Sequence, residues 1–193
     1  MELSEKAKGI LMLSARDSIH SLFGDKHPPI IDFKYYPELA QVGAGAFVTL
    51  NLNDQLRGCI GYITSDLTLF DTVCEAAKQA ATNDPRFYPV TENEFTEINL
   101  EISILSPLSP IYNYDQIQLG IHGLVLDDEY NRAILLPQVA VENNFDIPQF
   151  LTALCEKAGI DPYAWETEML NIKTFTAVVF SEIDNRKRTY EQG

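Results

Sequence analysis

The sequence predicts an α+β fold, with a mixed or antiparallel sheet and flanking helices. Helical periodicity and hairpin patterns are interspersed along the 193 residues, and strict strand–helix alternation is absent. This mixed order argues against a doubly wound parallel sheet. Apolar residues make up 46% and charged residues 22%, as in ordinary globular proteins. A chain of this length buries enough surface to fold without a metal or disulfide staple.

The N-terminal half is expected to contain two helices and one hairpin. In order, these are a helix over residues 4–23, a wrapped loop over 27–37, a hairpin of strands 46–52 and 56–63, and a helix over 67–81. Ser4 can cap the first helix, and Gly24 can end it. Pro85 sets the limit of the second helix, because the residue before a proline avoids the helical conformation.

The C-terminal half begins with the clearest strand of the chain, residues 98–104, in which apolar and polar side chains alternate. The expected elements that follow are a hairpin of 121–126 and 132–136, a helical turn over 138–144, a helix over 148–158, a short helical segment from 161, and a strand over 175–180. Asp146 and Gln149 have the spacing of a capping box, and Gly159 can end the helix. A polar tail at about 183–193 closes the chain.

The net charge and the cysteine content indicate which binding partners and which cellular compartment to expect. The net charge of −14 makes the surface repel phosphate backbones and anionic lipid, so neither nucleic acid nor membrane is an expected partner. No segment has the pattern of a signal peptide or a membrane helix. The cysteines are three and widely spaced, which is typical of a reducing cytoplasm.

The most informative motif is the hexapeptide LRGCIG at residues 56–61. Glycine weakens strands, so Gly58 and Gly61 indicate a bulge, a bend or a close approach by another group. Strand alternation predicts that Arg57, Cys59 and Gly61 share one face. A cationic neighbour lowers the pKa of a thiol and favours the reactive thiolate. The alternative is that Cys59 is a small core residue and Arg57 pairs with a surface carboxylate.

Further candidate residues lie in three other segments. Arg86 follows a proline-fixed turn and either faces a ligand or forms a structural salt bridge beside Asp84. Glu101 lies on the polar face of strand 98–104, where it either faces water or acts as an acid or base. His122 is the one histidine in a strand-like setting, and a Cys59–His122 pair is a hypothesis. No pattern for a metal or a cofactor is found, so neither is expected.

The hexapeptide is identical to the hallmark of the AMMECR domain family, known in bacteria and archaea as AmmeMemoRadiSam system protein A. Other blocks resemble the family in the family's order; these are residues 45–50, 84–87, 101–107, 122–124, 135–140 and 150–159. The resemblance implies a single domain over residues 1–193, with a larger and a smaller lobe around a cleft lined by the hexapeptide. By resemblance, the polar residues near that cleft are Arg57, Cys59, Asp84, Arg86, Glu101, His122 and Gln138.

Two functions of different classes stay open. In the first, Cys59 is a nucleophile toward a small anionic substrate, and His122 or Glu101 moves protons. In the second, which we favour, the chain is a binding or accessory protein. The resemblance implies Memo-type and radical-SAM proteins as its partners. A small anionic molecule would be bound by Arg57 and Arg86, with Gly58, Gly61, Asp84 and Gln138 beside it.

Overall fold

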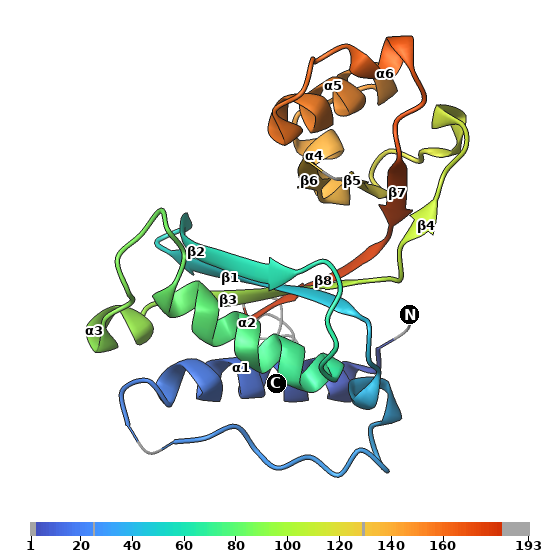
Figure 1. Ribbon diagram of the computed structural model, residues 1–193. Coiled ribbons are helices and arrows are strands. Elements are labelled where there is room, and N and C mark those ends of the chain that lie inside the picture. Colours follow the sequence, from blue (N-terminus) through green and yellow to red (C-terminus); the bar gives the residue numbers. More distant parts are fainter. Residues whose placement is uncertain (1–2, 25, 129, 183–193) are drawn as a thin grey trace, which may run out of the picture. The chain divides into compact units, whose positions relative to one another are not determined.

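The computed structural model describes residues 3–24, 26–128 and 130–182, and these fall into two compact units. The first unit combines the chain up to Leu105 with the chain from Val178, and the second is Ser106–Ala177. Each unit has its own sheet (Figure 1), and each has its own hydrophobic core. The single domain and the cleft between lobes stay predictions, and the polar tail at 183–193 lies outside the described residues.

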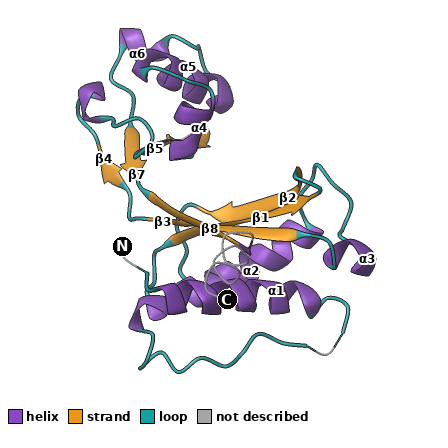
Figure 2. Cartoon of the chain, turned by 180° about the vertical axis from the view of Figure 1, so that it is seen from behind, coloured by secondary structure: helices purple, strands orange, loops and turns teal. Residues whose placement is uncertain are grey.

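The first unit is a four-stranded sheet with helices on one face. Its elements are α1 (Glu5–His20), η1 (Pro37–Ala40), β1 (Gly45–Leu52), β2 (Gln55–Tyr62), α2 (Leu69–Thr82), α3 (Glu92–Phe95), β3 (Asn99–Leu105) and β8 (Ala177–Ser181). The strand order is β2-β1-β3-β8, and β1 pairs antiparallel with both β2 and β3. Helices α1 and α2 cover the same face of this sheet (Figures 1 and 2).

The core of the first unit follows from alternation in the strands. Alternate residues of β1 and β3, among them Val48, Leu50, Leu100 and Ile102, are fully or almost fully buried in the cluster shared with α1 and α2, and Leu52 at the end of β1 is partly buried against it. The intervening residues form the other face of the sheet. We call this face the Cys59 face, and it includes Phe47, Thr49, Cys59, Gly61 and Glu101, which are cross-strand neighbours.

The hairpin of β1 and β2 turns through two residues. Asn53 and Asp54 have φ angles of 52° and 60°, so both adopt the left-handed conformation of a type I′ turn. Asn and Asp tolerate this conformation better than most residues, which explains why this polar pair makes the turn. Further along, the pairing register shifts between Leu50 and Asn51, which marks a β-bulge in the opposite strand.

The second unit is also a four-stranded antiparallel sheet, in the order β4-β7-β5-β6. Its elements are β4 (Ser109–Pro110), η2 (Tyr114–Gln116), β5 (Gly123–Asp127), β6 (Arg132–Leu135), α4 (Pro137–Glu142), α5 (Ile147–Ala158), α6 (Ala164–Thr167) and β7 (Ile172–Phe175). Phe150 and Leu154 of α5 are fully buried in the same cluster as Leu124 and Leu126 of β5. Asp146 and Gln149 form the expected capping box, and Gly159 ends α5 at a φ of 73°.

The α+β class with antiparallel sheets and flanking helices is confirmed. The expected strand over 175–180 is wrong in one respect, because the chain forms two strands there. β7 belongs to the second sheet, β8 belongs to the first, and Thr176 separates them. The carbonyl of Thr176 accepts a hydrogen bond from the Ser106 N–H, and its own N–H donates to the Ser106 Oγ. Among the described helices, none is both long and apolar enough to cross a bilayer.

Candidate functional site

Cys59 lies in the middle of β2 and is partly exposed. Its Sγ accepts a hydrogen bond from Thr49 Oγ1 at 3.3 Å, across the β1–β2 pair. Cys74 and Cys155 are buried, as their positions on apolar helix faces predict. Burial raises the pKa of both buried thiols, which disfavours their reactive form. Cys59 is therefore the cysteine to which a reagent or ligand has access.

Asp84 links the Cys59 backbone to Arg86. The backbone N–H of Cys59 donates to Asp84 Oδ2 at 2.8 Å. Arg86 donates to the same carboxylate from Nε at 2.9 Å and from Nη2 at 2.7 Å. The Asp84 side chain is 2% exposed, whereas that of Arg86 is 54% exposed. The structural salt bridge considered for this pair is thus present, and it also fixes the position of β2.

These contacts shift the protonation of both partners. The hydrogen bonds from Arg86, followed by those from backbone N–H groups, hold the pKa of Asp84 well below its usual range. The bonds to Asp84 raise the pKa of Arg86, and the nearby Cys59 thiol adds a smaller electrostatic contribution. Arg86 and the backbone of Cys59 are thus held by the same carboxylate, that of Asp84.

Because of the bulge, strand alternation no longer determines whether Arg57 shares a face with Cys59. Without a bulge, counting back from the turn would pair Thr49 with Gly58, but Thr49 is opposite Cys59. Arg57 is the extra residue of the bulge and has no cross-strand partner. Leu56 lies opposite Asn51 and therefore belongs to the Cys59 face. An extra residue in one strand breaks the alternation on which the expectation rested.

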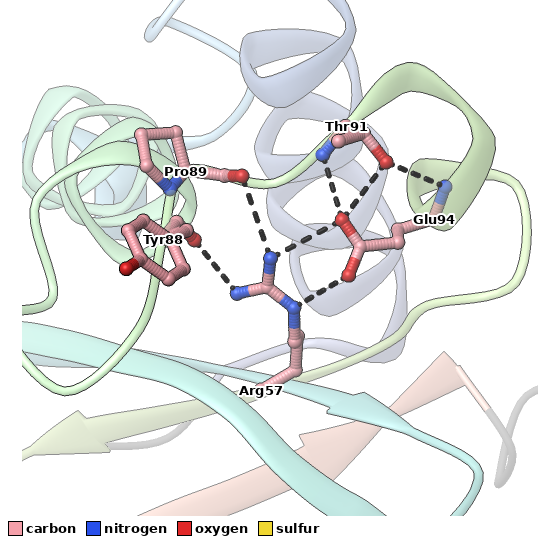
Figure 3. Close-up of polar contacts among 5 residues, drawn as sticks. All are labelled: Arg57, Tyr88, Pro89, Thr91 and Glu94. Atoms are coloured by element: carbon pink, nitrogen blue, oxygen red, sulfur yellow. Dashed lines mark hydrogen bonds and ion pairs between the residues drawn. The ribbon is translucent and has the colours of Figure 1, made fainter.

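The Arg57 guanidinium binds α3 and the segment that precedes it (Figure 3). Its Nε donates to Glu94 Oε1 at 2.8 Å, and its Nη1 donates to the carbonyl of Tyr88 at 3.0 Å. Its Nη2 reaches the carbonyl of Pro89 at 3.4 Å and Glu94 Oε2 at 3.2 Å. The pairing of Arg57 with a carboxylate, the alternative raised above, is the one observed. This guanidinium holds the 88–94 segment against β2.

Glu94 was not identified from the sequence, although a signal for it exists. Thr91 and Glu94 have the spacing of a capping box, which the structure forms at the start of α3. Hydrogen bonds from Arg57 and Thr91 lower the pKa of Glu94 to about 2. Glu94 thus satisfies the helix start and the Arg57 guanidinium together. Phe87 lies near both guanidinium groups, with Cζ–centroid distances of 5.8 Å for Arg57 and 5.5 Å for Arg86.

The two glycines of the hexapeptide are needed for close packing. A Cβ atom at Gly58 would lie 2.4 Å from the carbonyl oxygen of Ala80 in α2. A Cβ atom at Gly61 would lie 2.3 Å from the carbonyl oxygen of Ala46 and 2.4 Å from the Phe47 ring. Gly58 therefore allows the contact between β2 and α2. Gly61 leaves room for the Phe47 ring on the Cys59 face.

The remaining candidates fall in both units. Glu101 of β3 is opposite Thr49, which is itself opposite Cys59, so the three residues form one cross-strand row. His122 and Gln138 belong to the second unit, so the Cys59–His122 pair stays a prediction. The Nδ1 of His122 accepts a hydrogen bond from the Gln118 N–H at 3.2 Å. His122 also lines a cavity of about 430 Å³ in that unit.

Clusters of metal-ligating side chains are absent from the described part of the chain. Across residues 3–24, 26–128 and 130–182, no group of three or more His, Cys, Asp or Glu side chains is placed to hold an ion. The site around Cys59 thus consists of a partly exposed thiol, a half-exposed guanidinium on a buried carboxylate, and a neighbouring row of polar side chains. Such a set can bind an anion or hold a thiol for reaction with an electrophile.

Comparison with known proteins defines the class of protein. The AMMECR1 family model matches residues 12–180, and the chain belongs to this family. A protein of Methanocella arvoryzae is 42% identical over 147 residues, covering 72% of this chain and 74% of its own. Protein MJ0810 of Methanocaldococcus jannaschii is 39% identical over 165 residues, covering 81% and 82%.

A solved structure is similar over almost the whole chain. It is the uncharacterized protein PH0010 of Pyrococcus horikoshii, which aligns with a TM-score of 0.83 at 34% sequence identity. The alignment covers 94% of each chain. These relatives carry no assigned activity in their names, so function has to be argued from the site itself.

Proposed function

We propose that this chain is a binding protein of the AmmeMemoRadiSam system protein A type, and that the Cys59 site takes a small anionic molecule. The observation that carries the proposal is the exposure of Arg86. Its Nε and Nη2 are fixed on Asp84, while 54% of its side chain is exposed. Among the described residues, its Nη1 has no hydrogen-bond acceptor. A guanidinium edge that is held in place and open on one side suits a carboxylate or phosphate group.

The surroundings of Arg86 favour selective binding over general attraction. The chain carries a net charge of −14, so an anion gains nothing from the overall field. Binding therefore depends on the local geometry of Arg86 and on the groups beside it. Thr49 and Cys59 supply a hydroxyl and a thiol on the adjacent strands, within 3.3 Å of each other. Asp84 is already saturated with hydrogen bonds. Its negative charge therefore interacts with Arg86 rather than with an incoming ligand.

The test uses Cys59 as the reporter. Iodoacetamide is added to the folded chain, and mass spectrometry follows alkylation at each cysteine, with the buried Cys74 and Cys155 as internal references. Acetate, citrate, phosphate and pyrophosphate are compared at constant ionic strength. We expect at least one anion to slow Cys59 alkylation in a saturable way. Alkylation rates that no anion changes would overturn the proposal.

A matched pair of variants separates local binding from bulk charge. The Arg86→Gln variant should lose the protection by the anion, whereas Arg132→Gln, which removes another exposed guanidinium paired with Asp127, should keep it. Because Arg86→Gln leaves the buried Asp84 unpaired, Asp84→Asn/Arg86→Gln is measured as well. Equal protection in all variants would show that Arg86 does not hold the anion.

The partner proteins rest on the family resemblance. Memo-type and radical-SAM proteins of the same system are proposed to act with this chain, in the reducing cytoplasm that its cysteine content favours. Purified partners from one host can be mixed with the chain and analysed by size-exclusion chromatography with light scattering. Co-elution of a complex supports an accessory role. Independent elution of all components, with and without the anion identified above, contradicts it.

A second function is supported by the partial exposure of Cys59 and by Asp84, which binds both the Cys59 N–H and the Arg86 guanidinium. In this reading the Cys59 sulfur attacks an electrophilic carbon, and Glu101, in the same cross-strand row, moves protons. With p-nitrophenyl acetate, attack would form a thioester at Cys59 and release p-nitrophenolate, and water would then free acetate. A burst of one p-nitrophenolate per chain that Cys59→Ser abolishes, followed by turnover, supports an enzyme. Turnover equal to that of Cys59→Ser contradicts it.

A further inference from the structure

The second unit contains an aromatic cavity that is separate from the site around Cys59. It has a volume of about 510 Å³ and lies beside helices α5 and α6. Its aromatic walls are Phe145, Tyr163 and Trp165, and its carboxylates are Glu156 and Glu166. A cavity of this size is in the range that holds small molecules. Its lining contains no lysine or arginine.

The Trp165 ring is fixed in its position. Its Nε1 donates a hydrogen bond to Thr152 Oγ1 at 3.0 Å, and its ring makes an edge contact with Tyr114 at a centroid distance of 6.3 Å. The polar edge of the indole is therefore satisfied within the protein. What the indole offers to the cavity is its aromatic surface, whose faces attract cations.

The charges around the cavity are unbalanced. Glu156 and Glu166 are both exposed, and neither has an ion-pair partner among the described residues. Lys157 is next to Glu156 in the sequence, but its Nζ donates to the carbonyl of Ile134 at 2.8 Å. The two carboxylates would repel an apolar anion, and a neutral ligand would form no ionic contact with them. A ligand with an apolar body and a positive charge matches both the rings and the carboxylates.

We propose that this cavity binds a small organic cation, such as an alkylated ammonium compound. The aromatic rings would contact the alkyl groups and the positive charge together, as in cation–π recognition of quaternary ammonium groups. Glu156 and Glu166 would neutralise the charge at the open side. This proposal does not depend on the function proposed for the Cys59 site, since its residues all belong to the second unit.

Trp165 is the single tryptophan of the chain, so its fluorescence reports directly on the cavity. The full chain is titrated with tetramethylammonium chloride, with sodium chloride at equal ionic strength as the salt control. The neutral isostere tert-butanol tests whether the positive charge matters. We expect a saturable change of Trp165 emission with tetramethylammonium alone. Equal responses to tert-butanol, or a response that sodium chloride reproduces, would overturn the proposal.

Charge variants localise the binding. Glu156→Gln/Glu166→Gln should weaken tetramethylammonium binding by about fivefold or more, because two favourable charges are removed. Glu142→Gln, an exposed carboxylate on α4 outside the cavity, is the matched control and should bind like the unmodified chain. All these positions are exposed, so the variants keep the fold. Tyr163→Leu, at a side chain that is 59% exposed, should also weaken binding. Unchanged affinity in the double variant would contradict the proposed site.

Discussion

The backbone N–H of Cys59 donates to the buried carboxylate of Asp84 over 2.8 Å, which joins strand β2 to the residues that follow helix α2. Asp84 is in turn held by Arg86. The contact spans 25 positions of sequence, so it forms only when the hairpin has packed on α2. The thiol and the half-exposed guanidinium are thereby fixed on one scaffold, which is the basis of the site proposed above.

Asp84→Asn should destabilise the fold. The amide keeps one oxygen acceptor but lacks the negative charge to which Arg86 and the Cys59 N–H donate. Its NH₂ group also replaces an oxygen that accepts hydrogen bonds in the native chain. Disruption of such a buried charged network costs about 2–4 kcal/mol. Urea unfolding followed by circular dichroism measures this loss. The control is Asp66→Asn, at an exposed carboxylate. A free energy of unfolding equal to that of the control would contradict the role given to Asp84.

Stability should fall as the solution becomes acidic. The pKa of Glu94 is lowered to about 2 in the folded chain, and the pKa of Asp84 is held well below its usual range. In the unfolded chain both groups have ordinary pKa values and bind protons first, so acid favours unfolding. Their stabilising contribution is complete above about pH 5; that of Glu94 is lost as the pH falls through about 2, and that of Asp84 is lost at still lower pH. Unfolding free energies measured across this range should decline less steeply in Glu94→Gln. An equal decline would contradict the low pKa.

The two glycines of the hexapeptide should not accept a side chain. Gly58→Ala and Gly61→Ala each place a Cβ within 2.4 Å of a backbone carbonyl oxygen that cannot move away cheaply. Overpacking of this kind costs about 1–3 kcal/mol or more. Gly9→Ala is the control, because its Cβ meets nothing within 4 Å inside helix α1, and it should stabilise the chain. Thermal unfolding measures all three. A neutral Gly58→Ala variant would contradict the close contact of β2 with α2.

The Arg57–Glu94 pair should hold the 88–94 segment in place. Glu94→Gln leaves Arg57 with the carbonyls of Tyr88 and Pro89 and weakens the start of α3, so about 1–2 kcal/mol is expected to be lost. Limited proteolysis should then cleave faster near Tyr88, which is 91% exposed. The control is Glu97→Gln, at an exposed carboxylate beyond the helix. Equal cleavage rates in the two variants would contradict this role.

Local patterns in the sequence predicted most of the fold. Ser4 caps α1, the Asp146–Gln149 pair caps α5, and Cys74 and Cys155 are buried on helix faces, because spacing along one helix determines these features. The break at Thr176 could not be foreseen, since alternation of apolar residues does not tell to which sheet a strand belongs.

The candidate site was predicted less completely. The paired glycines indicated a bulge or close approach, and both occur, but the bulge falls at Arg57, whose guanidinium binds Glu94 and the carbonyls of Tyr88 and Pro89. Strand alternation alone cannot place such an extra residue. The contact between Asp84 and the Cys59 N–H depends on tertiary packing, and no spacing in the sequence encodes it.

An NMR titration tests the anion site most directly. The ¹⁵N-labelled chain is titrated with inorganic phosphate and with citrate at constant ionic strength and pH, and backbone amide shifts are followed. The site predicts saturable shifts centred on the amides of Cys59 and Arg86, both of which donate to Asp84. These shifts should disappear in Arg86→Gln. Amide shifts that are absent at Cys59 and Arg86, or that are spread evenly over the chain, would contradict an anion site there.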